Sequence, residues 1–381
     1  MSEARVNNLS NESNSGGPTI TGITTFSSPY FFIPPVGNTE ERPENPEKGS
    51  IRYNTDTGHL EYFKGIVPVD WVQIEASNEE LNGGIRAICM GGSDGPALGD
   101  NKDVIDYFNV DIPGNAIDFG DLTEGMYGGA GLADRTRSVV AGDAGSPAYK
   151  STIEYVTISS TGNSQDFGDI AAPNIQMTAF ASSTRGVVAG GYEHPAYTDR
   201  MQYVTIQTTG NTVDFGNLTA GTGYLYGGAS TTRGITAGGD APTTVNTIEY
   251  ITISSTGNAS NFGDLLTLRW SGSGCSNSTR MLIAGGRIAP SPSGSNTIEY
   301  ITIATLGNAI DFGDLDRTAD YASTSFVSSP TRGVFAAGRY SPLTNRMDMV
   351  TIATTGNAVD WGDTTIQRYG SACSSNGHGG L

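Results

Sequence analysis

Short apolar runs alternate with turns rich in Gly, Ser, Thr and Asn along most of the chain. Residues 280–286 have the length and continuous apolar character of a buried strand, and residues 296–303 predict a second one. In the second run, Ile298 points to one side of the strand and Ile301 to the other, so both faces are largely apolar. A sheet of such strands is expected to lie between two neighbouring layers.

This pattern occurs six times. A Gly-Asn pair followed by an aromatic-Gly pair recurs every 47 to 50 residues, with its first glycine at Gly114, Gly162, Gly210, Gly257, Gly307 and Gly356. An arginine that precedes a short apolar run recurs at Arg86, Arg137, Arg185, Arg233, Arg280 and Arg332. Each period contains four predicted strands. Four-stranded units repeated six times predict an all-β chain with the architecture of a six-bladed β-propeller.

The order of strands within a period resembles the kelch repeat. A strand of small residues is followed by a strand that ends in Gly-Gly, a strand with Tyr and a strand with an aromatic residue. The Gly-Gly pair is present at residues 91–92, 190–191, 238–239 and 285–286. The resemblance covers about residues 85–381 and implies that residues 81–381 form a six-bladed kelch-like β-propeller.

The two ends of the repeat array are complementary. No strand of small residues precedes Arg86, whereas residues 368–375 repeat the pattern of residues 269–276 after the last full period. We therefore expect the C-terminal strand to complete the first blade, because this pairing removes two exposed sheet edges.

The first 80 residues differ from the repeats. Residues 1–47 predict an extended arm and an acidic linker, since they are polar and contain few apolar side chains. Their one compact apolar run is either an attachment point for a partner or packing on the next module, and it consists of Tyr30, Phe31, Phe32 and Ile33. Residues 48–80 predict a small antiparallel β-module with a turn at residues 56–58.

The module has the pattern Ser-Ile-Arg-Tyr-Asn-Thr-Asp-Thr-Gly, then Leu-Glu-Tyr-Phe, then Trp-Val-Gln-Ile. It resembles a module of tail fibres and other structural proteins of tailed phages. With its Thr-Ile-Glu-Tyr-Ile-Thr-Ile and Asp-Phe-Gly-Asp-Leu repeats, nearly the whole chain resembles repeat-bearing virion proteins of marine, cyanophage-type phages. The resemblance implies a virion component assembled in the host cytoplasm. The resemblance does not assign its place in the virion, and the tail, the neck or a capsid appendage are the alternatives. It implies contacts with other virion proteins and no enzymatic activity.

The amino-acid composition excludes several classes of binding partner. The chain has 21 basic and 39 acidic side chains, a net charge of −18, and 52 glycines among 381 residues. This acidic balance argues against nucleic acid as a partner, and the absence of a long apolar run argues against membrane insertion. The high glycine content argues against long helices. A homo-oligomer within the particle is compatible with all of these properties.

Three cysteines, an odd number, favour a reducing compartment. We expect Cys89, Cys275 and Cys373 to be free thiols. Cys89 and Cys373 should share the first blade but lie about three residues out of register, which is roughly 10 Å along a strand. This separation is too large for a disulfide.

Candidate chemistry is sparse. His59, His194 and His378 lie in different regions, so the sequence predicts no catalytic residue, no metal site and no cofactor. The six recurrent arginines are expected to make one repeated hydrogen bond or ion pair between blades. The recurrent acids are calcium ligands, solvated side chains or partners of the recurrent arginines, and they include Asp118, Asp166, Asp214, Asp311, Asp360, Asp121, Asp169, Asp264, Asp314 and Asp363.

The segments that follow Gly-Gly differ from blade to blade, whereas the other turns repeat almost unchanged. Alternate turns of a blade lie on opposite faces of the disk, so the variable segments should gather on one face, where recognition is expected. The candidate ligand face consists of Tyr149, Tyr192, His194, Tyr197, Arg287, Arg339 and Tyr340.

The sequence thus favours a non-enzymatic virion protein that displays a propeller for binding a host-surface glycan or protein. Two alternatives are a propeller enzyme that acts on surface polysaccharide and a bacterial lectin-like propeller.

Overall fold

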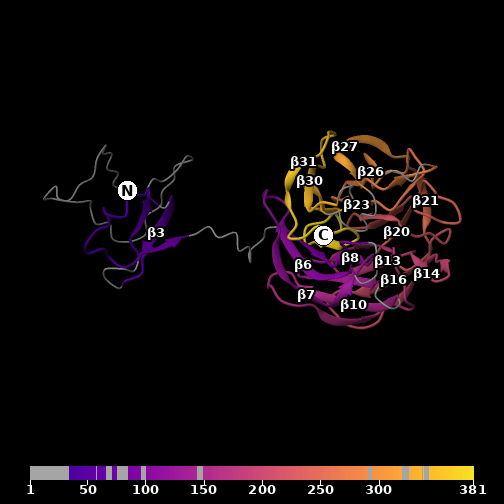
Figure 1. Cartoon of the computed structure of the whole chain (residues 1–381), viewed down its shortest axis with the longest axis horizontal. Coiled ribbons are helices and arrows are strands. Elements are labelled where there is room, and N and C mark those ends of the chain that lie inside the picture. The colour runs from indigo at the N-terminus through magenta and orange to yellow at the C-terminus, as the bar shows by residue number, and fades with distance from the viewer. Residues whose placement is uncertain are drawn as a thin grey trace, which may run out of the picture. The chain divides into compact units, whose positions relative to one another are not determined.

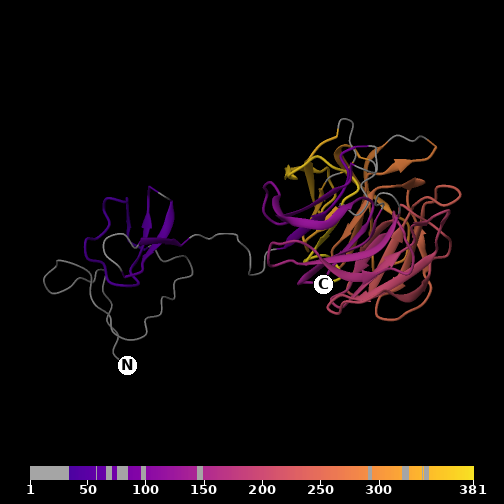
Figure 2. The same ribbon diagram turned by 60° about the horizontal axis from the view of Figure 1, so that its bottom comes forward.

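The computed structural model describes residues 34–56, 58–65, 71–74, 85–95, 100–143, 149–290, 294–319, 326–336, 338 and 343–381. All regular elements in these ranges are strands, so the protein is all-β. No helix in the described part of the chain is long and apolar enough to cross a membrane. The chain divides into two compact units, Met1–Glu79 (unit 1) and Glu80–Leu381 (unit 2), as Figure 1 and Figure 2 show.

Unit 1 contains one four-stranded sheet in the order β1-β2-β3-β4. Its strands are β1 (Val36–Gly37), β2 (Ile51–Asn54), β3 (His59–Phe63) and β4 (Trp71–Ile74). The expected turn joins β2 and β3, where the Gly58 amide donates to the Asn54 carbonyl at 2.9 Å. Strand β1 pairs in parallel with β2. The sheet therefore begins earlier in the chain than residue 48, which was the predicted start of the module, and it is not entirely antiparallel.

The two faces of this sheet have an unusual polarity. Glu61 is completely buried on one face, and Arg42 donates to its carboxylate from Nε at 3.1 Å and from Nη2 at 2.5 Å. This hydrogen-bonded pair lowers the pKa of Glu61. The opposite face exposes a patch of apolar side chains, with Val36 at 58%, Ile51 at 51%, Tyr53 at 36% and Leu60 at 38%.

The described residues of unit 2 form six four-stranded antiparallel sheets, which we number in chain order. The first has the order β32 (Ala372–Ser375), β5 (Arg86–Met90), β6 (Lys102–Asn109) and β7 (Ile117–Met126). The second has β8 (Ala130–Ala133), β9 (Arg137–Asp143), β10 (Lys150–Thr157) and β11 (Gln165–Asp169). The third has β12 (Thr178–Ala181), β13 (Arg185–Ala189), β16 (Arg200–Thr205) and β17 (Val213–Asn217).

The fourth sheet has β18 (Tyr226–Ala229), β19 (Arg233–Ala237), β20 (Thr247–Thr252) and β21 (Ser260–Asp264). The fifth has β23 (Ser273–Ser276), β24 (Arg280–Ala284), β26 (Ser295–Thr302) and β27 (Ile310–Ala319). The sixth has β28 (Phe326–Ser328), β29 (Arg332–Ala336), β30 (Arg346–Thr351) and β31 (Val359–Asp363). Two short pairs accompany them, β14 (Tyr192–Glu193) with β15 (Ala196–Tyr197) and β22 (Arg269–Trp270) with β25 (Arg287–Ile288).

The six sheets follow one another in a cycle. The first strand of each sheet contacts the first strand of the next, through β8, β12, β18, β23, β28, β32 and back to β8. Figure 1 shows the sheets arranged around a centre, where the C-terminus lies. Apolar clusters fill the spaces between neighbouring sheets. The expectation that both faces of residues 296–303 are buried is confirmed, since Ile298 and Ile301 belong to clusters on opposite sides of the fifth sheet.

The outer edges of the sheets are joined by the repeated Gly-Asn and aromatic-Gly pairs. Between the first and second sheets, the Gly162 amide donates to the Phe119 carbonyl at 2.8 Å. The Asp121 amide donates to Asn163 Oδ1 at 3.1 Å. The same Gly-to-carbonyl bond recurs at each further step, from Gly210 to Phe167, Gly257 to Phe215, Gly307 to Phe262, Gly356 to Phe312 and Gly114 to Trp361. The last of these bonds joins the sixth sheet to the first.

Only glycine fits the aromatic-Gly position. Gly120 has a φ of +149°, and a Cβ atom at this position would lie 2.5 Å from the carbonyl oxygen of Gly162. The close approach of two backbones therefore explains why this glycine recurs in every repeat.

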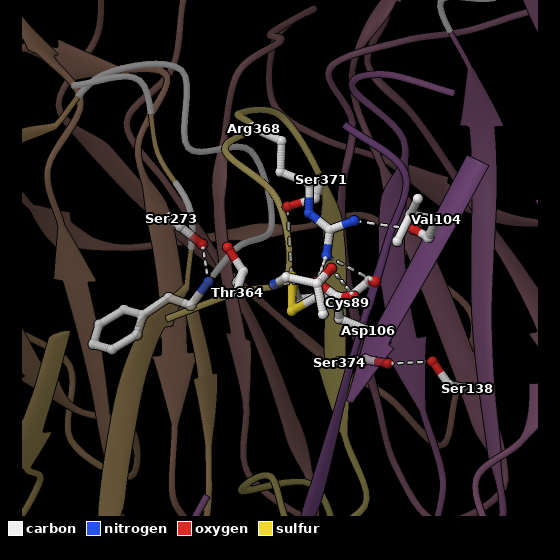
Figure 3. The surroundings of a disulfide bond; sticks show 12 residues. Cys89, Val104, Asp106, Ser138, Ser273, Thr364, Arg368, Ser371 and Ser374 are labelled. Atoms are coloured by element: carbon white, nitrogen blue, oxygen red, sulfur yellow. Dashed lines mark hydrogen bonds and ion pairs between the residues drawn. A yellow bond between two sulfur atoms is a disulfide. The ribbon is translucent and has the colours of Figure 1, made fainter. Parts of the chain in front are cut away.

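The two ends of unit 2 meet in the first sheet. Strand β32 pairs with β5, which confirms the expected pairing of the C-terminal strand. The hydroxyl groups of Ser374 in β32 and Ser138 in β9 lie 2.6 Å apart and connect this sheet to the second one (Figure 3).

The prediction of three free thiols is wrong. Cys89 and Cys373 form a disulfide, with a Cα–Cα distance of 4.1 Å, and only Cys275 is free and buried. The predicted offset of three residues is also wrong, since Cys373 lies directly opposite Cys89 in the register of β32 and β5. No turn connects these two strands, so their register could not be counted along the chain as it can in a hairpin.

Replacing Gly120 with Ala should lower the free energy of unfolding by roughly 2–5 kcal/mol, because it adds a steric clash to backbone strain. Gly162→Ala is the matched control, since its Cβ would meet nothing within 4 Å although φ is +153°. This control should lose only the strain, roughly 1–3 kcal/mol. Urea unfolding of both variants measures the difference. Equal losses would contradict the role assigned to the close backbone contact.

Reduction of the Cys89–Cys373 disulfide should destabilise unit 2 by roughly 2–5 kcal/mol, since the bond closes a loop of 284 residues in the unfolded chain. Thermal unfolding with and without dithiothreitol measures this change. The double variant Cys89→Ala/Cys373→Ala should melt at one temperature under both conditions. A wild-type melting temperature that does not respond to the reductant would refute the contribution of the bond.

Candidate functional site

The recurrent arginines have a structural role. The guanidinium group of Arg185 donates to the Ile253 carbonyl of the next sheet at 2.9 Å, and it lies 4.3 Å from the centre of the Tyr203 ring. The same carbonyl bond recurs for Arg86 to Ile158, Arg137 to Ile206, Arg233 to Ile303, Arg280 to Ile352 and Arg332 to Asp111. The prediction of one repeated hydrogen bond between sheets is therefore confirmed.

The sixth repeat differs in a way that explains its tryptophan. Met349 stands where the other repeats have a tyrosine under the arginine. Arg332 lies over the ring of Trp361 instead, 5.1 Å from its centre. The larger aromatic side chain thus supplies the cation–π contact that the methionine cannot make.

A second set of polar side chains was not recognised in the sequence. It occupies one position on the third strand of each sheet, and in five sheets it accepts a hydrogen bond from a backbone amide of the preceding sheet, at Asp106, Glu154, Gln202, Glu249 and Glu299. Asp106 also pairs with Arg368 at 2.7 Å (Figure 3), and Glu299 pairs with Arg269 at the same distance. Burial lowers the pKa of Arg368, although the Asp106 carboxylate opposes this shift.

The recurrent exposed acids do not gather. Asp118 and Asp121 are both exposed on the outer strand of the first sheet. Within the described ranges, no group of three or more His, Cys, Asp or Glu side chains could hold a metal ion.

Four of the residues predicted for the ligand face do gather, and we call them the tyrosine cluster: Tyr149, Tyr192, His194 and Tyr197. The ring of Tyr192 lies 6.3 Å from that of Tyr149, 6.0 Å from that of His194 and 5.3 Å from that of Tyr197. The three tyrosines are half-buried and His194 is exposed. The short pair β14-β15 brings Tyr192 opposite Tyr197, which positions two of the rings.

Tyr197 is the fixed member of this cluster. Its hydroxyl group donates to Asp240 Oδ2 at 2.8 Å, and its ring lies against Gly223, where an added Cβ would come within 3.0 Å of it. Burial, followed by the hydrogen bond to Asp240, raises the pKa of Tyr197, so its hydroxyl group stays protonated. Asp240 is not among the residues that the sequence pattern predicts for the ligand face.

A second aromatic group lies next along the chain. The rings of Tyr224 and Trp270 are 5.1 Å apart, and the guanidinium group of Arg287 lies 5.2 Å from the Trp270 ring. Arg287 therefore belongs to this second group. A third pair, Tyr127 and Tyr369, has its rings 5.4 Å apart. The remaining predicted residues lie outside the described part of the chain: Arg339, Tyr340, Tyr30, Phe31, Phe32 and Ile33.

The segments that carry these aromatic residues are linked to one another. Gly128, Gln176, Tyr224 and Ser271 each have a positive φ and precede the first strand of successive sheets. Each amide donates to the carbonyl of the preceding member, from Gly128 to Gly370, Gln176 to Gly128, Tyr224 to Gln176 and Ser271 to Tyr224, at 2.8–3.1 Å. Three of these positions hold a strained non-glycine residue, a feature that is common at functional sites.

The centre of unit 2 is filled. The inner strands enclose a cavity of about 60 Å³, which is too small for an organic ligand. Residues 376–381 fold against these strands, where the Gly379 amide donates to the Ser276 carbonyl at 2.8 Å. His378 Nδ1 accepts from the Gly380 amide at 3.1 Å, so the ring is neutral and its Nε2 donates to the Ala133 carbonyl at 2.7 Å. A larger cavity, of about 470 Å³, lies beside residues 376–381 and is lined by residues that include Arg86, Arg135 and Asn376.

Known proteins give no further guidance. No protein-family model matches the chain, and no curated protein sequence matches it.

Desolvation lowers the pKa of His378 in the folded protein. The unfolded chain therefore binds a proton at His378 more readily than the folded protein does. The free energy of unfolding should keep its full value above about pH 6.5 and decrease as the pH falls below this value. The added slope cannot exceed that of one proton, about 1.4 kcal/mol per pH unit. Urea unfolding of wild type and His378→Gln between pH 7.5 and 5 measures it. A glutamine keeps one donor and one acceptor, so this variant should lack the added slope; identical pH profiles would contradict the assignment.

Proposed function

We propose that this protein is a non-enzymatic structural protein of a tailed-phage virion. In this proposal, unit 2 is a six-bladed kelch-like β-propeller that binds a host-surface ligand, and the N-terminal region attaches it to the particle. The cycle of six sheets supports the propeller architecture, because each sheet meets two neighbours through the same backbone contacts. The sequence resemblance to phage structural proteins supports the virion role.

The observation that carries the binding function is the contrast between repeated and unrepeated side chains. The arginines recur in every sheet, and with the polar side chains on the third strands they make hydrogen bonds that hold the sheets together. The aromatic groups at Tyr192 and Trp270 do not recur, and both rings remain partly exposed. Loops on a rigid scaffold that vary and expose aromatic rings are typical of recognition surfaces.

Unit 1 supports the attachment role. Its sheet buries charged groups and exposes Val36, Ile51, Tyr53 and Leu60 on one face. A contiguous apolar face on so small a unit is typical of a surface that contacts another protein. We propose that a neighbouring virion protein covers this face.

The test separates attachment from host binding. A chain that lacks residues 1–79 should not be incorporated when it replaces the full chain during phage assembly, but it should still bind host cells as a purified protein. The double variant Ile51→Ser/Leu60→Ser should reduce incorporation in the full chain, whereas Val213→Ser, an equally exposed change on unit 2, should not.

Incorporation of the shortened chain at the wild-type level would refute attachment through the N-terminal region. Hydrolysis of host polysaccharide by the purified chain would refute the non-enzymatic function and favour the propeller enzyme.

A further inference from the structure

We infer that the tyrosine cluster and the adjacent Tyr224–Trp270 group form a binding site for a neutral glycan. This inference rests on the proposed function and names the ligand class for the ligand face. The site is made of two groups that touch. Tyr197 packs on Gly223, and Tyr224, which follows, begins the second group.

The arrangement of the rings suits sugar rings. Tyr192 is in edge-to-face contact with Tyr149 and Tyr197 and stacks against His194, with an angle of 29° between the two rings. These contacts hold the rings in place before a ligand arrives, so little conformational entropy is lost on binding. Half-exposed tyrosine and tryptophan rings combine an apolar face with a polar tip. A pyranose has the complementary surface, with C–H bonds on its faces and hydroxyl groups around its edge.

Polar groups for those hydroxyl groups are present at the margin. Asp240 is half-buried, and Oδ2 of its carboxylate already accepts the Tyr197 hydroxyl group. Its Oδ1 has only a long contact of 3.5 Å with the Thr244 hydroxyl group, which leaves acceptor capacity for a ligand hydroxyl. Because the Tyr197–Asp240 bond also fixes the carboxylate, sugar hydroxyl groups would meet an acceptor of defined position.

Charge favours a neutral glycan over an acidic one. The protein carries a net charge of −18, and the Tyr197 hydroxyl group of the tyrosine cluster donates to an acid, Asp240. A carboxylated or phosphorylated polysaccharide would be repelled by the net charge of the protein and, close to the site, by the Asp240 carboxylate. Arg287 adds one positive charge to the second group, where it lies over the Trp270 ring.

A glycan fits this surface better than a protein. A stable protein interface buries about 800 Å² on each partner and has a continuous apolar core. Here the aromatic rings form two small adjoining groups, each of the size of one or two sugar rings. A chain of sugar units can contact several such groups in turn, and the link through Gly223 and Tyr224 provides two adjacent positions.

The experiment uses the purified full chain and affinity electrophoresis in gels that contain dextran, mannan, laminarin or galactomannan as neutral probes and alginate as the acidic probe. We expect retardation by at least one neutral polysaccharide and none by alginate. Tyr192→Ala should weaken the binding at least tenfold, whereas Tyr192→Phe should retain most of it. Ile117→Ala, an exposed apolar change on an outer strand, should bind as wild type does.

Tyr224→Gly provides an independent readout. Gly128 and Gly370 occupy the equivalent positions, so the backbone accepts glycine there while one aromatic ring is lost. This variant should be at least as stable as wild type and bind the polysaccharide several-fold more weakly. The melting temperature of this variant shows whether weaker binding is caused by the missing ring or by unfolding of the protein.

Three outcomes would overturn the inference: no retardation by any neutral probe, tighter binding of alginate, or unchanged binding by Tyr192→Ala. Incorporation of Tyr192→Ala into phage particles is measured in parallel. If this variant is incorporated and still binds host cells, the glycan site is wrong and the virion function stands. If it loses binding to host cells but the wild type binds no polysaccharide, the ligand face recognises a host protein.

Discussion

The contact between two backbones at the Gly-Asn and aromatic-Gly pairs is the constraint on which unit 2 depends. Gly162 donates to the Phe119 carbonyl, and its own carbonyl approaches Gly120 so closely that no Cβ fits between them. The contact gives the outer strand of each sheet hydrogen-bond partners on the neighbouring sheet. Six sheet edges that would otherwise be free for pairing with other chains are thereby blocked.

The first sheet needs additional stabilising contacts, because the two ends of unit 2 meet in it without a connecting turn. Ordinary strand pairing between β32 and β5 is reinforced by the Cys89–Cys373 disulfide and by the buried pair of Arg368 and Asp106. The fifth sheet has a similar buried pair in Arg269 and Glu299 but no disulfide. The reinforcement is thus greatest where the chain itself supplies no covalent link between adjacent strands.

This division of roles leaves one set of segments free to vary. The turns that carry the arginines and the Gly-Asn pairs are constrained by contacts with the next sheet. The segments that carry Tyr192, Tyr224 and Trp270 are linked mainly through backbone hydrogen bonds, which tolerate different side chains. Aromatic residues can therefore accumulate there without disturbing the cycle of sheets.

The sequence alone determined the all-β class, the number and order of strands in each repeat, the role of the arginines and the pairing of the C-terminal strand with the first sheet. These features follow from the periodicity of the sequence. The same strand assignment is obtained in each of the six repeats, so the repeats support one another. Four residues of the tyrosine cluster were also identified, because they lie in segments that differ between repeats.

Only the tertiary structure decided the features that join distant parts of the chain. The register of Cys89 and Cys373 depends on two strands with no common turn, and the contacts of Tyr197 with Asp240 and Gly223 join neighbouring sheets. Such contacts leave no periodic signal, because each occurs once and depends on the distance between separate sheets.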